Sequence, residues 1–372
     1  MEPFTLLIKP SGSDCNLDCR YCFYKCRSPE IGQGRQRMTD SVLERLVADY
    51  LKLRFEQSSF AWQGGEPMLM GLDFYKRVVE LQKQYGSTGQ LVSNALQTNA
   101  VLLDEKWCRF FQENQFLVGI SIDGPKEFHD YYRVDHSGAG TFDKVLGAIK
   151  LCKEQKVEFN VLVLINNLNA GHPDKLFDFF LDLGIRYLQF IPCVERDPAT
   201  GQIADFSVAP AMYGAFLCRL FDRWYESGPT KISIRDFDSV LSYCLTRHHT
   251  ICTFSRQCSQ YIVVEHNGDC FPCDFFVKPE WRLGNILDTP VEKLAASSKK
   301  RDFARAKQKL CNKCLLCSHL ALCRGGCMKD KNALDTNWNT ETYFCESYRR
   351  FFEHTMPRFL QLAARINTLS RP

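Results

Sequence analysis

Cysteine content constrains this chain more than any other feature, because 19 of its 372 residues are cysteines. The N-terminus has neither the basic region nor the apolar core of a secretory signal, so we expect a cytoplasmic protein with reduced thiols. Clustered thiols in a reduced compartment usually bind metal or carry out redox chemistry. Four cysteines lie within residues 15–26, five are scattered through the middle, and ten lie within residues 252–345. This distribution predicts an N-terminal site and a cysteine-dense C-terminal part.

The first 230 residues alternate between short apolar runs and segments with helical periodicity. The predicted strands are residues 5–9, 60–63, 90–97, 116–122, 159–165 and 187–191. The predicted helices are one capped by Thr39 and those over residues 72–85, 104–114, 141–155, 173–184 and 210–228. Six strands, each followed by a helix, predict a parallel α/β domain.

The pattern changes after about residue 230. Asn267-Gly268 separates two short β-like runs, and this dipeptide favours the type I′ turn of a tight hairpin. The tail from residue 346 to about residue 366 has a helical pattern that Pro357 should interrupt. We therefore expect a domain over residues 1–230, a cysteine-rich domain over residues 231–345 and a helical tail over residues 346–372.

Charge and hydropathy exclude two classes of partner. The formal net charge is only +4, which gives no electrostatic footprint for a nucleic acid. No apolar run approaches the 18 residues or so that a membrane-spanning helix needs. We expect neither nucleic-acid nor membrane binding.

The first cysteine motif reads C-x3-C-x2-C and consists of Cys15, Cys19 and Cys22. Cys19 and Cys22 alone could form a thioredoxin-like redox pair, which leaves Cys15 without a role. With Cys26 the motif could bind zinc through four thiolates, and thiolates are also the usual ligands of iron–sulfur clusters. Spacing alone leaves these alternatives open.

A second motif, WQGGEP over residues 62–67, ends the second predicted strand. Its two glycines allow backbone to approach a ligand closely, and Glu66 adds a carboxylate that suits an ammonium group. The alternative is a plain turn between a strand and a helix. By itself the motif is weak evidence for a ligand-binding turn. The cysteine motif one strand upstream strengthens that interpretation.

Together the two motifs, with Tyr21 before the last cysteine and Phe23-Tyr24 after it, resemble the radical S-adenosylmethionine enzymes. The resemblance implies that Cys15, Cys19 and Cys22 hold three irons of a 4Fe–4S cluster whose fourth iron binds S-adenosylmethionine. Cys26 would then be a bystander. It also implies an open six-unit parallel (β/α)6 partial barrel.

The C-terminal cysteines resemble the SPASM extension, which adds two auxiliary 4Fe–4S clusters to such enzymes. The resemblance implies one set of ligands formed by Cys252, Cys258, Cys273 and Cys327, and a second formed by Cys314, Cys317, Cys323 and Cys345. The alternative is one or two structural zinc sites, because these spacings also fit zinc ribbons. The remaining thiols would be bystanders: Cys108, Cys152, Cys193, Cys218, Cys244, Cys270 and Cys311.

The motif set as a whole resembles the anaerobic sulfatase-maturating enzymes. It comprises KPSGSDCNLDCRYCFY, WQGGEP, LQTN, SIDGP and CDFF…RLGNI. These enzymes oxidise a Cys or Ser of a sulfatase to Cα-formylglycine without oxygen, using a 5′-deoxyadenosyl radical. An auxiliary cluster is the natural acceptor for the remaining electron. The resemblance therefore implies S-adenosylmethionine and three 4Fe–4S clusters as cofactors.

Asp274, directly after Cys273, matches the position of the proton acceptor in this family. Its alternative is a turn carboxylate that caps local amides. The resemblance further implies contacts with S-adenosylmethionine by Tyr21, Gly65, Glu66, Ser121, Arg133 and Val194. Strand-end positions place Gln63, Gln97 and Asn99 near the mouth of the barrel.

The implied partners are an unfolded or nascent sulfatase polypeptide and an electron donor such as flavodoxin or ferredoxin, and we expect a monomer. The main alternative function is a SPASM peptide maturase that forms thioether or carbon–carbon crosslinks on a ribosomal peptide. A third hypothesis is a non-enzymatic zinc or iron–sulfur scaffold for protein binding. The three-cysteine motif and the GGE motif argue against it, because together they imply a cluster with one iron left open for a ligand.

Overall fold

The computed structural model describes residues 1–24, 35–197, 199–331 and 338–369. They fall into two compact units. The first unit comprises residues 1–122, 129–159 and 258–304, and the second comprises residues 123–128, 160–257 and 305–372. Among the helices of these described residues, none is long and apolar enough to cross a membrane.

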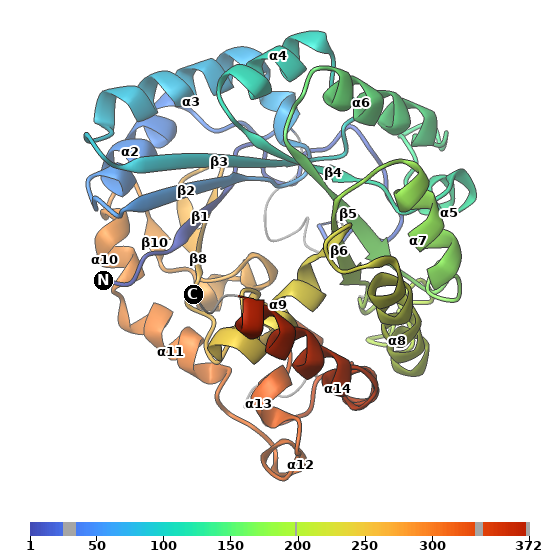
Figure 1. The fold of residues 1–372 in the computed structure, drawn as a ribbon. Coiled ribbons are helices and arrows are strands. Elements are labelled where there is room, and N and C mark those ends of the chain that lie inside the picture. Colours follow the sequence, from blue (N-terminus) through green and yellow to red (C-terminus); the bar gives the residue numbers. More distant parts are fainter. Residues whose placement is uncertain (25–34, 198, 332–337, 370–372) are drawn as a thin grey trace. The chain divides into compact units, whose positions relative to one another are not determined.

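The first unit is built on a mostly parallel sheet in the order β10-β9-β8-β1-β2-β3-β4 (Figure 1). The parallel strands are β1 (Thr5–Lys9), β2 (Gln57–Trp62), β3 (Leu91–Thr98), β4 (Leu117–Ser121) and β8 (Tyr261–Glu265). Two short antiparallel strands extend it at one edge, β9 (Asp269–Phe271) and β10 (Gly284–Asn285). The sheet does not close into a barrel, as predicted, and the count of six β/α units stays a prediction.

Amphipathic helices cover this sheet, as Figure 1 shows for α2 and α3 over β1–β3. The helices of the first unit's chain segments are α2 (Asp40–Leu51), α3 (Leu72–Tyr85), α4 (Glu105–Glu113), α6 (Phe142–Glu154) and α10 (Val291–Ala295), with α5 (Lys126–Tyr132) and α11 (Ser298–Ala306) at its boundaries. Thr39 caps α2 as predicted, since its hydroxyl accepts a hydrogen bond from the Val42 N–H at 3.4 Å.

The second unit contains the strands β5-β6-β7 and a helical layer rich in aromatic side chains. Its strands are β5 (Phe159–Ile165), β6 (Tyr187–Pro192) and β7 (Ser233–Ile234). Its helices are α7 (Pro173–Asp182), α8 (Pro210–Ser227), α9 (Arg235–Thr246), α12 (Asn312–Leu315), α13 (Leu320–Cys323) and α14 (Cys345–Leu369). The predicted stop of α7 at Gly184 is present, because Gly184 has a φ of +62°.

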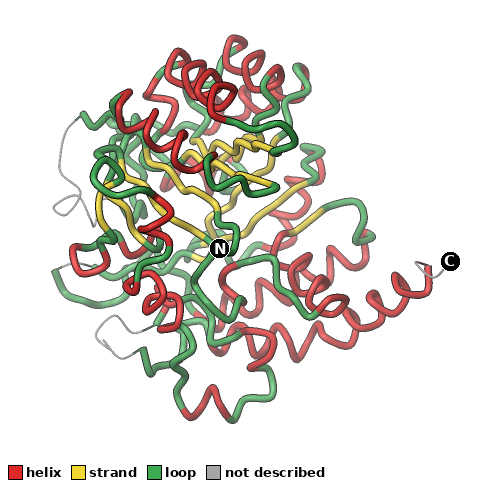
Figure 2. Tube along the Cα trace, turned by 90° about the vertical axis from the view of Figure 1, so that its left-hand side faces the viewer, coloured by secondary structure: helices red, strands yellow, loops and turns green. Residues whose placement is uncertain are grey.

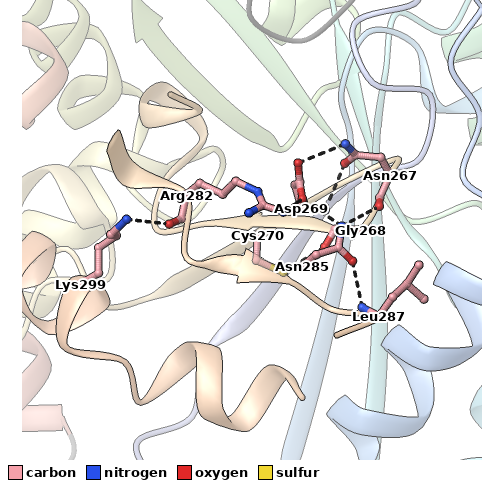
Figure 3. Close-up of polar contacts among 8 residues, drawn as sticks. All are labelled: Asn267, Gly268, Asp269, Cys270, Arg282, Asn285, Leu287 and Lys299. Atoms are coloured by element: carbon pink, nitrogen blue, oxygen red, sulfur yellow. Dashed lines mark hydrogen bonds and ion pairs between the residues drawn. The ribbon is translucent and has the colours of Figure 1, made fainter. Parts of the chain in front are cut away.

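Two expectations about local structure are wrong. The β8–β9 hairpin forms, but Asn267 is not among the described residues with positive φ, so the turn is not type I′. Instead the Gly268 N–H donates to the Glu265 carbonyl at 2.9 Å, and Gly268 takes a φ of +87° after that turn. Figure 3 shows the side chains of Asn267, Asp269 and Asn285 that surround it. Pro357 does not interrupt the tail: α14 is one helix with Pro357 inside it, and Figure 2 shows it running unbroken toward the C-terminus.

Candidate active site

The first cysteine motif lies in the loop after β1, in the first unit. N–H donors contact two of its sulfur atoms. The Leu17 backbone nitrogen lies 3.4 Å from Cys15 Sγ, and Asn99 Nδ2 lies 3.7 Å from the same atom. Arg133 Nη1 lies 3.8 Å from Cys19 Sγ. N–H donors of this kind stabilise thiolates that ligate a metal. The surroundings of Cys15 and Cys19 are therefore compatible with thiolate ligands, and the cluster itself stays a prediction. Cys26 lies outside the described residues.

The electrostatics of Cys15 also suit a metal. Burial raises the pKa of its thiol above the usual range, and the negative charges of Glu66, Cys19 and Cys22 raise it further. Three thiolates this close repel one another, and a bound cation offsets that repulsion.

The GGE turn is joined to the cysteine loop by backbone hydrogen bonds. The Gly65 N–H donates to the Gly12 carbonyl and the Glu66 N–H to the Asp14 carbonyl, each at 2.8 Å. A Cβ on Gly65 would lie 2.0 Å from the Asp14 carbonyl oxygen, which no backbone tolerates. Glycine is required here because two stretches of backbone lie in direct contact.

Glu66 is fully buried, and its carboxylate is occupied by the protein itself. It accepts hydrogen bonds from the Met68 N–H at 3.0 Å, the Thr98 hydroxyl at 2.8 Å and the Asn99 N–H at 2.8 Å. Burial raises the pKa of Glu66 to about 7, although these hydrogen bonds oppose the shift. The observed role of Glu66 is thus to hold the turn against β3, and its direct contact with a cofactor stays a prediction.

The other predicted contacts of S-adenosylmethionine divide between the units. In the first unit, the Tyr21 ring lies 5.5 Å from the Tyr132 ring and 5.9 Å from the Arg133 guanidinium. Ser121 ends β4 and accepts a hydrogen bond from Gln97 Nε2 at 3.0 Å. In the second unit, the Val194 carbonyl accepts a hydrogen bond from Lys329 Nζ at 2.8 Å.

Asp274 begins the short helix η4 (Asp274–Phe276), and its carboxylate contacts side chains from distant segments of the first unit. It is ion-paired with Lys9 at the end of β1. The Tyr24 hydroxyl lies 3.4 Å from Oδ1, and Gln63 Nε2 donates to Oδ2 at 3.2 Å. These contacts favour a functional carboxylate over the alternative of a turn residue that caps local amides.

Lys9 was missed by the sequence reasoning. It is fully buried, pairs in register with Glu265 on β8 and lies 3.4 Å from the Glu265 carboxylate. Burial lowers the pKa of Lys9, but the attraction of Asp274, Tyr24 and Glu265 outweighs it and leaves the pKa above the usual value. The signal in the sequence was a lysine ending an apolar strand, a position where parallel strands present functional groups.

Two of the cysteines predicted to bind the first auxiliary cluster, Cys258 and Cys273, belong to the first unit, and both act electrostatically on the buried Lys300. Burial lowers the pKa of Lys300 to about 8, while Cys273 and Cys258 raise it. The other two, Cys252 and Cys327, belong to the second unit. There the Cys252 carbonyl accepts a hydrogen bond from Lys307 Nζ at 2.6 Å.

The second auxiliary set lies within the second unit. Burial raises the pKa of Cys314 to about 12, with further contributions from Cys311, Cys323 and Cys345. Burial likewise raises the pKa of Cys345 to about 12, and Cys323 adds to the shift. These effects place Cys314, Cys323 and Cys345 near one another, and their role as cluster ligands stays a prediction. The Cys311 sulfur lies 3.6 Å from that of Cys314, so this predicted bystander is next to the set.

The other predicted bystanders among the described residues are mostly buried. Cys108 and Cys152 are buried between α4 and α6 with their sulfur atoms 4.0 Å apart. Cys193, Cys218 and Cys270 are also buried, and Cys244 is half-buried. The burial of these thiols is typical of cysteines that act as small apolar side chains.

Comparison with known proteins agrees with this geometry. Residues 10–180 match the radical SAM superfamily, and residues 252–318 match SPASM, an iron–sulfur cluster-binding domain. A cysteine-type anaerobic sulfatase-maturating enzyme of Clostridium perfringens strain 13 is 40% identical over 98% of this chain and 100% of its own length. A serine-type enzyme of Bacteroides thetaiotaomicron is 37% identical over 96% of this chain and 90% of its own length.

Solved structures show the same relationship. The solved structure of native anSMEcpe with bound AdoMet and the Cp18Cys peptide has a TM-score of 0.91 and 38% identity, over 98% of this chain and 100% of its own. SuiB of Streptococcus suis has a TM-score of 0.67 at 15% identity, over 92% of this chain and 77% of its own, which shows a shared fold. This chain therefore belongs to the family of anaerobic sulfatase-maturating enzymes, which are oxidoreductases with a radical SAM and a SPASM domain.

Proposed function

We propose that this enzyme oxidises a Cys or Ser residue of a sulfatase to Cα-formylglycine, with Asp274 as the base. The observation that carries the assignment of the base is the environment of Asp274. Its carboxylate follows the predicted ligand Cys273 and is held by Lys9, Tyr24 and Gln63. The relatives of both cysteine type and serine type support the substrate class.

The cofactor assignments follow from the donor sets described above. Cys15, Cys19 and Cys22 would hold the cluster that binds S-adenosylmethionine, and the two C-terminal sets would hold one auxiliary cluster each. When bound, these groups would supply the radical that removes a hydrogen atom from the substrate Cβ and an acceptor for the electron left behind.

Asp274 would take the proton from the substrate thiol or hydroxyl. The oxidation removes two electrons and two protons from the side chain: one hydrogen atom, one proton and one further electron leave. A Ser side chain becomes the aldehyde directly, whereas a Cys side chain becomes a thioaldehyde that water then hydrolyses to the aldehyde with release of hydrogen sulfide. A base beside the reacting group is needed for the proton. Lys9 and Gln63 would orient the carboxylate, and Tyr24 would orient it through its hydroxyl.

Further roles are part of the same proposal. Tyr21, Gly65, Ser121, Arg133 and Val194 would contact S-adenosylmethionine, with Glu66 supporting the turn that carries Gly65. The domain boundaries would lie near residues 230 and 345. The enzyme would act as a cytoplasmic monomer with a flavodoxin or ferredoxin as electron donor.

Two peptides test the proposal. The enzyme is reconstituted anaerobically with iron and sulfide and incubated with S-adenosylmethionine, a reductant and a sulfatase-motif peptide that carries either Cys or Ser. Mass spectrometry should detect formylglycine on at least one peptide, together with 5′-deoxyadenosine. 5′-Deoxyadenosine without an aldehyde on either peptide would favour the peptide maturase instead.

Asp274→Asn tests the base. Because Asn accepts no proton, the variant should bind as much iron as the unchanged enzyme, about 12 atoms per chain for three clusters, but lose most of the formylglycine product. Unchanged turnover would remove Asp274 from this role.

A further inference from the structure

Lys300 is a lysine of α11 that is almost completely buried, with 5% of its surface exposed. Its Nζ donates to three backbone carbonyls in the first unit: Cys258 at 3.3 Å, Tyr261 at 2.6 Å and Pro272 at 3.2 Å. Pro272 directly precedes Cys273. One side chain thus joins the two segments that carry Cys258 and Cys273.

The hydrogen bonds also identify the protonation state of this side chain. An ammonium group has three N–H donors, and the three carbonyl oxygens match that number. All three acceptors are uncharged carbonyls, so these hydrogen bonds do not neutralise the ammonium charge. The positive charge of Lys300 therefore lies against the backbone of Cys258 and of Pro272, the residue before Cys273.

The second unit repeats this arrangement at Cys252. Lys307 is 1% exposed, and its Nζ donates to the carbonyls of Cys252 at 2.6 Å and Thr253 at 2.8 Å. A buried lysine is rare and costly, because an ammonium group loses its hydration there. Within each unit, a buried ammonium bonded to the backbone of a predicted ligand therefore indicates a function connected with that ligand.

We propose that Lys300 is a positioning residue for the first auxiliary cluster, which fixes the segments of Cys258 and Cys273 and raises the reduction potential of the cluster by its charge. A positive charge close to a cluster favours the form with one more electron, and its effect is larger where water is excluded. This inference rests on the proposed function in taking Cys258 and Cys273 as ligands. It explains how that cluster would be suited to accept an electron.

The test compares Lys300 with its neighbour Lys299, which is exposed and donates to the Arg282 carbonyl at 2.9 Å (Figure 3). Lys300→Gln removes the charge but keeps N–H donors, Lys300→Met removes both, and Lys299→Gln is the matched control. Each change is made in the full chain with Cys15, Cys19 and Cys22 replaced by Ala, so that only the C-terminal clusters titrate. The readouts are iron content and the midpoint potentials from an anaerobic redox titration followed by EPR.

We expect one of the two potentials to become more negative in Lys300→Gln, with a change of about tenfold in the reduction equilibrium, or about 59 mV for one electron. The Lys299→Gln potentials should be unchanged. Loss of one cluster from both Lys300 variants, with Lys299→Gln intact, would also support the positioning role. Unchanged potentials and iron content in Lys300→Gln and Lys300→Met would overturn the proposal. Because no sulfatase peptide is used, failure of the proposed function would appear only in the peptide experiment.

Discussion

Lys9 ends β1 with an ammonium group that no solvent reaches. Two carboxylates share it, Asp274 and Glu265, and Tyr24 covers it with its ring at 4.6 Å. A buried ion pair depends on both partners, because removing one leaves an uncompensated charge. Lys9 therefore links the stability of the first unit to the position of the proposed base.

Lys9→Met should lower both stability and activity. It leaves the buried carboxylate of Glu265 and the partly buried one of Asp274 without their cation, so we expect a loss of about 3 kcal/mol in the free energy of unfolding. Formylglycine formation should fall by roughly 10²-fold or more, since the base loses its orientation. The double variant Lys9→Met/Glu265→Gln should regain stability in thermal unfolding but not activity. Recovery of activity in the double variant would show that Lys9 only balances charge.

Gly65→Ala tests the contact between the GGE turn and the cysteine loop. The new Cβ would lie 2.0 Å from the Asp14 carbonyl oxygen, so the loop that carries Cys15 must move. We expect a loss of about 1–3 kcal/mol in stability and reduced iron binding after reconstitution. Gly147→Ala in α6 is the control, because nothing lies within 4 Å of its added Cβ. Equal iron content in the two variants would contradict the argument.

At the scale of elements, a buried histidine connects α5 with the start of α6. His129 Nε2 lies 3.0 Å from the Thr141 hydroxyl, which donates to the Arg133 carbonyl at 3.1 Å. The hydroxyl therefore accepts its bond from a neutral His129 that carries its proton on Nε2. Burial lowers the pKa of His129 to about 2, and the charge of Arg133 lowers it further.

Stability should therefore fall as the pH falls below about 6.5, where the unfolded chain binds a proton that the folded chain excludes. Between about pH 7 and pH 5.5, His129 should lower the free energy of unfolding by about 1 kcal/mol. That loss corresponds to a melting temperature lower by about 2 °C. His129→Gln can still donate to Thr141 but does not titrate. Its melting temperature should vary less with pH over that interval, and an equal slope in both proteins would exclude His129 as the cause.

Elements with a clear period were predictable from the sequence. The predicted strand over residues 159–165 and the helix over residues 72–85 match β5 and α3 in both bounds. Helix α5 has seven residues, too few to show a helical period, and was missed. Helix α9 was missed although Phe237, Val240 and Tyr243 bury one side of it at helical spacing, so its signal was present.

The candidate site was predictable only where a motif carries the chemistry. The cysteine motifs and Asp274 could be singled out as candidate ligands and base through a family resemblance, because both are local in the sequence. Lys9 and Lys300 were missed, since a lysine is usually exposed and only the fold shows its partners. Lys9 lies beside Glu265 through strand pairing across about 250 residues, which no local pattern reveals.

At the scale of the whole molecule, two kinds of stabilisation are visible within the chain. In the second unit, α8, α9 and α14 pack through buried aromatic side chains, among them Trp224, Phe237 and Phe351. Between them in sequence, residues 311–327 contain only the four-residue helices α12 and α13. Helices this short are not stable by themselves, so this segment must depend on other bonds, which ligation of the proposed auxiliary clusters would supply.

Removing iron should therefore loosen residues 311–327 before it affects the aromatic core. Arg324 has a φ of +50°, which is unfavourable for a residue with a Cβ, and bonds at the predicted ligands Cys323 and Cys327 would help to hold it. After anaerobic chelation, trypsin should cut first at Lys313 and Arg324, while Arg365 in α14 should be cut at the same rate as in the iron-loaded enzyme. Cys314→Ala should reproduce the pattern without a chelator. Mass spectrometry of the fragments measures the cleavage. Equal rates of cleavage at Lys313 and Arg324 with and without iron would show that the segment is stable without metal.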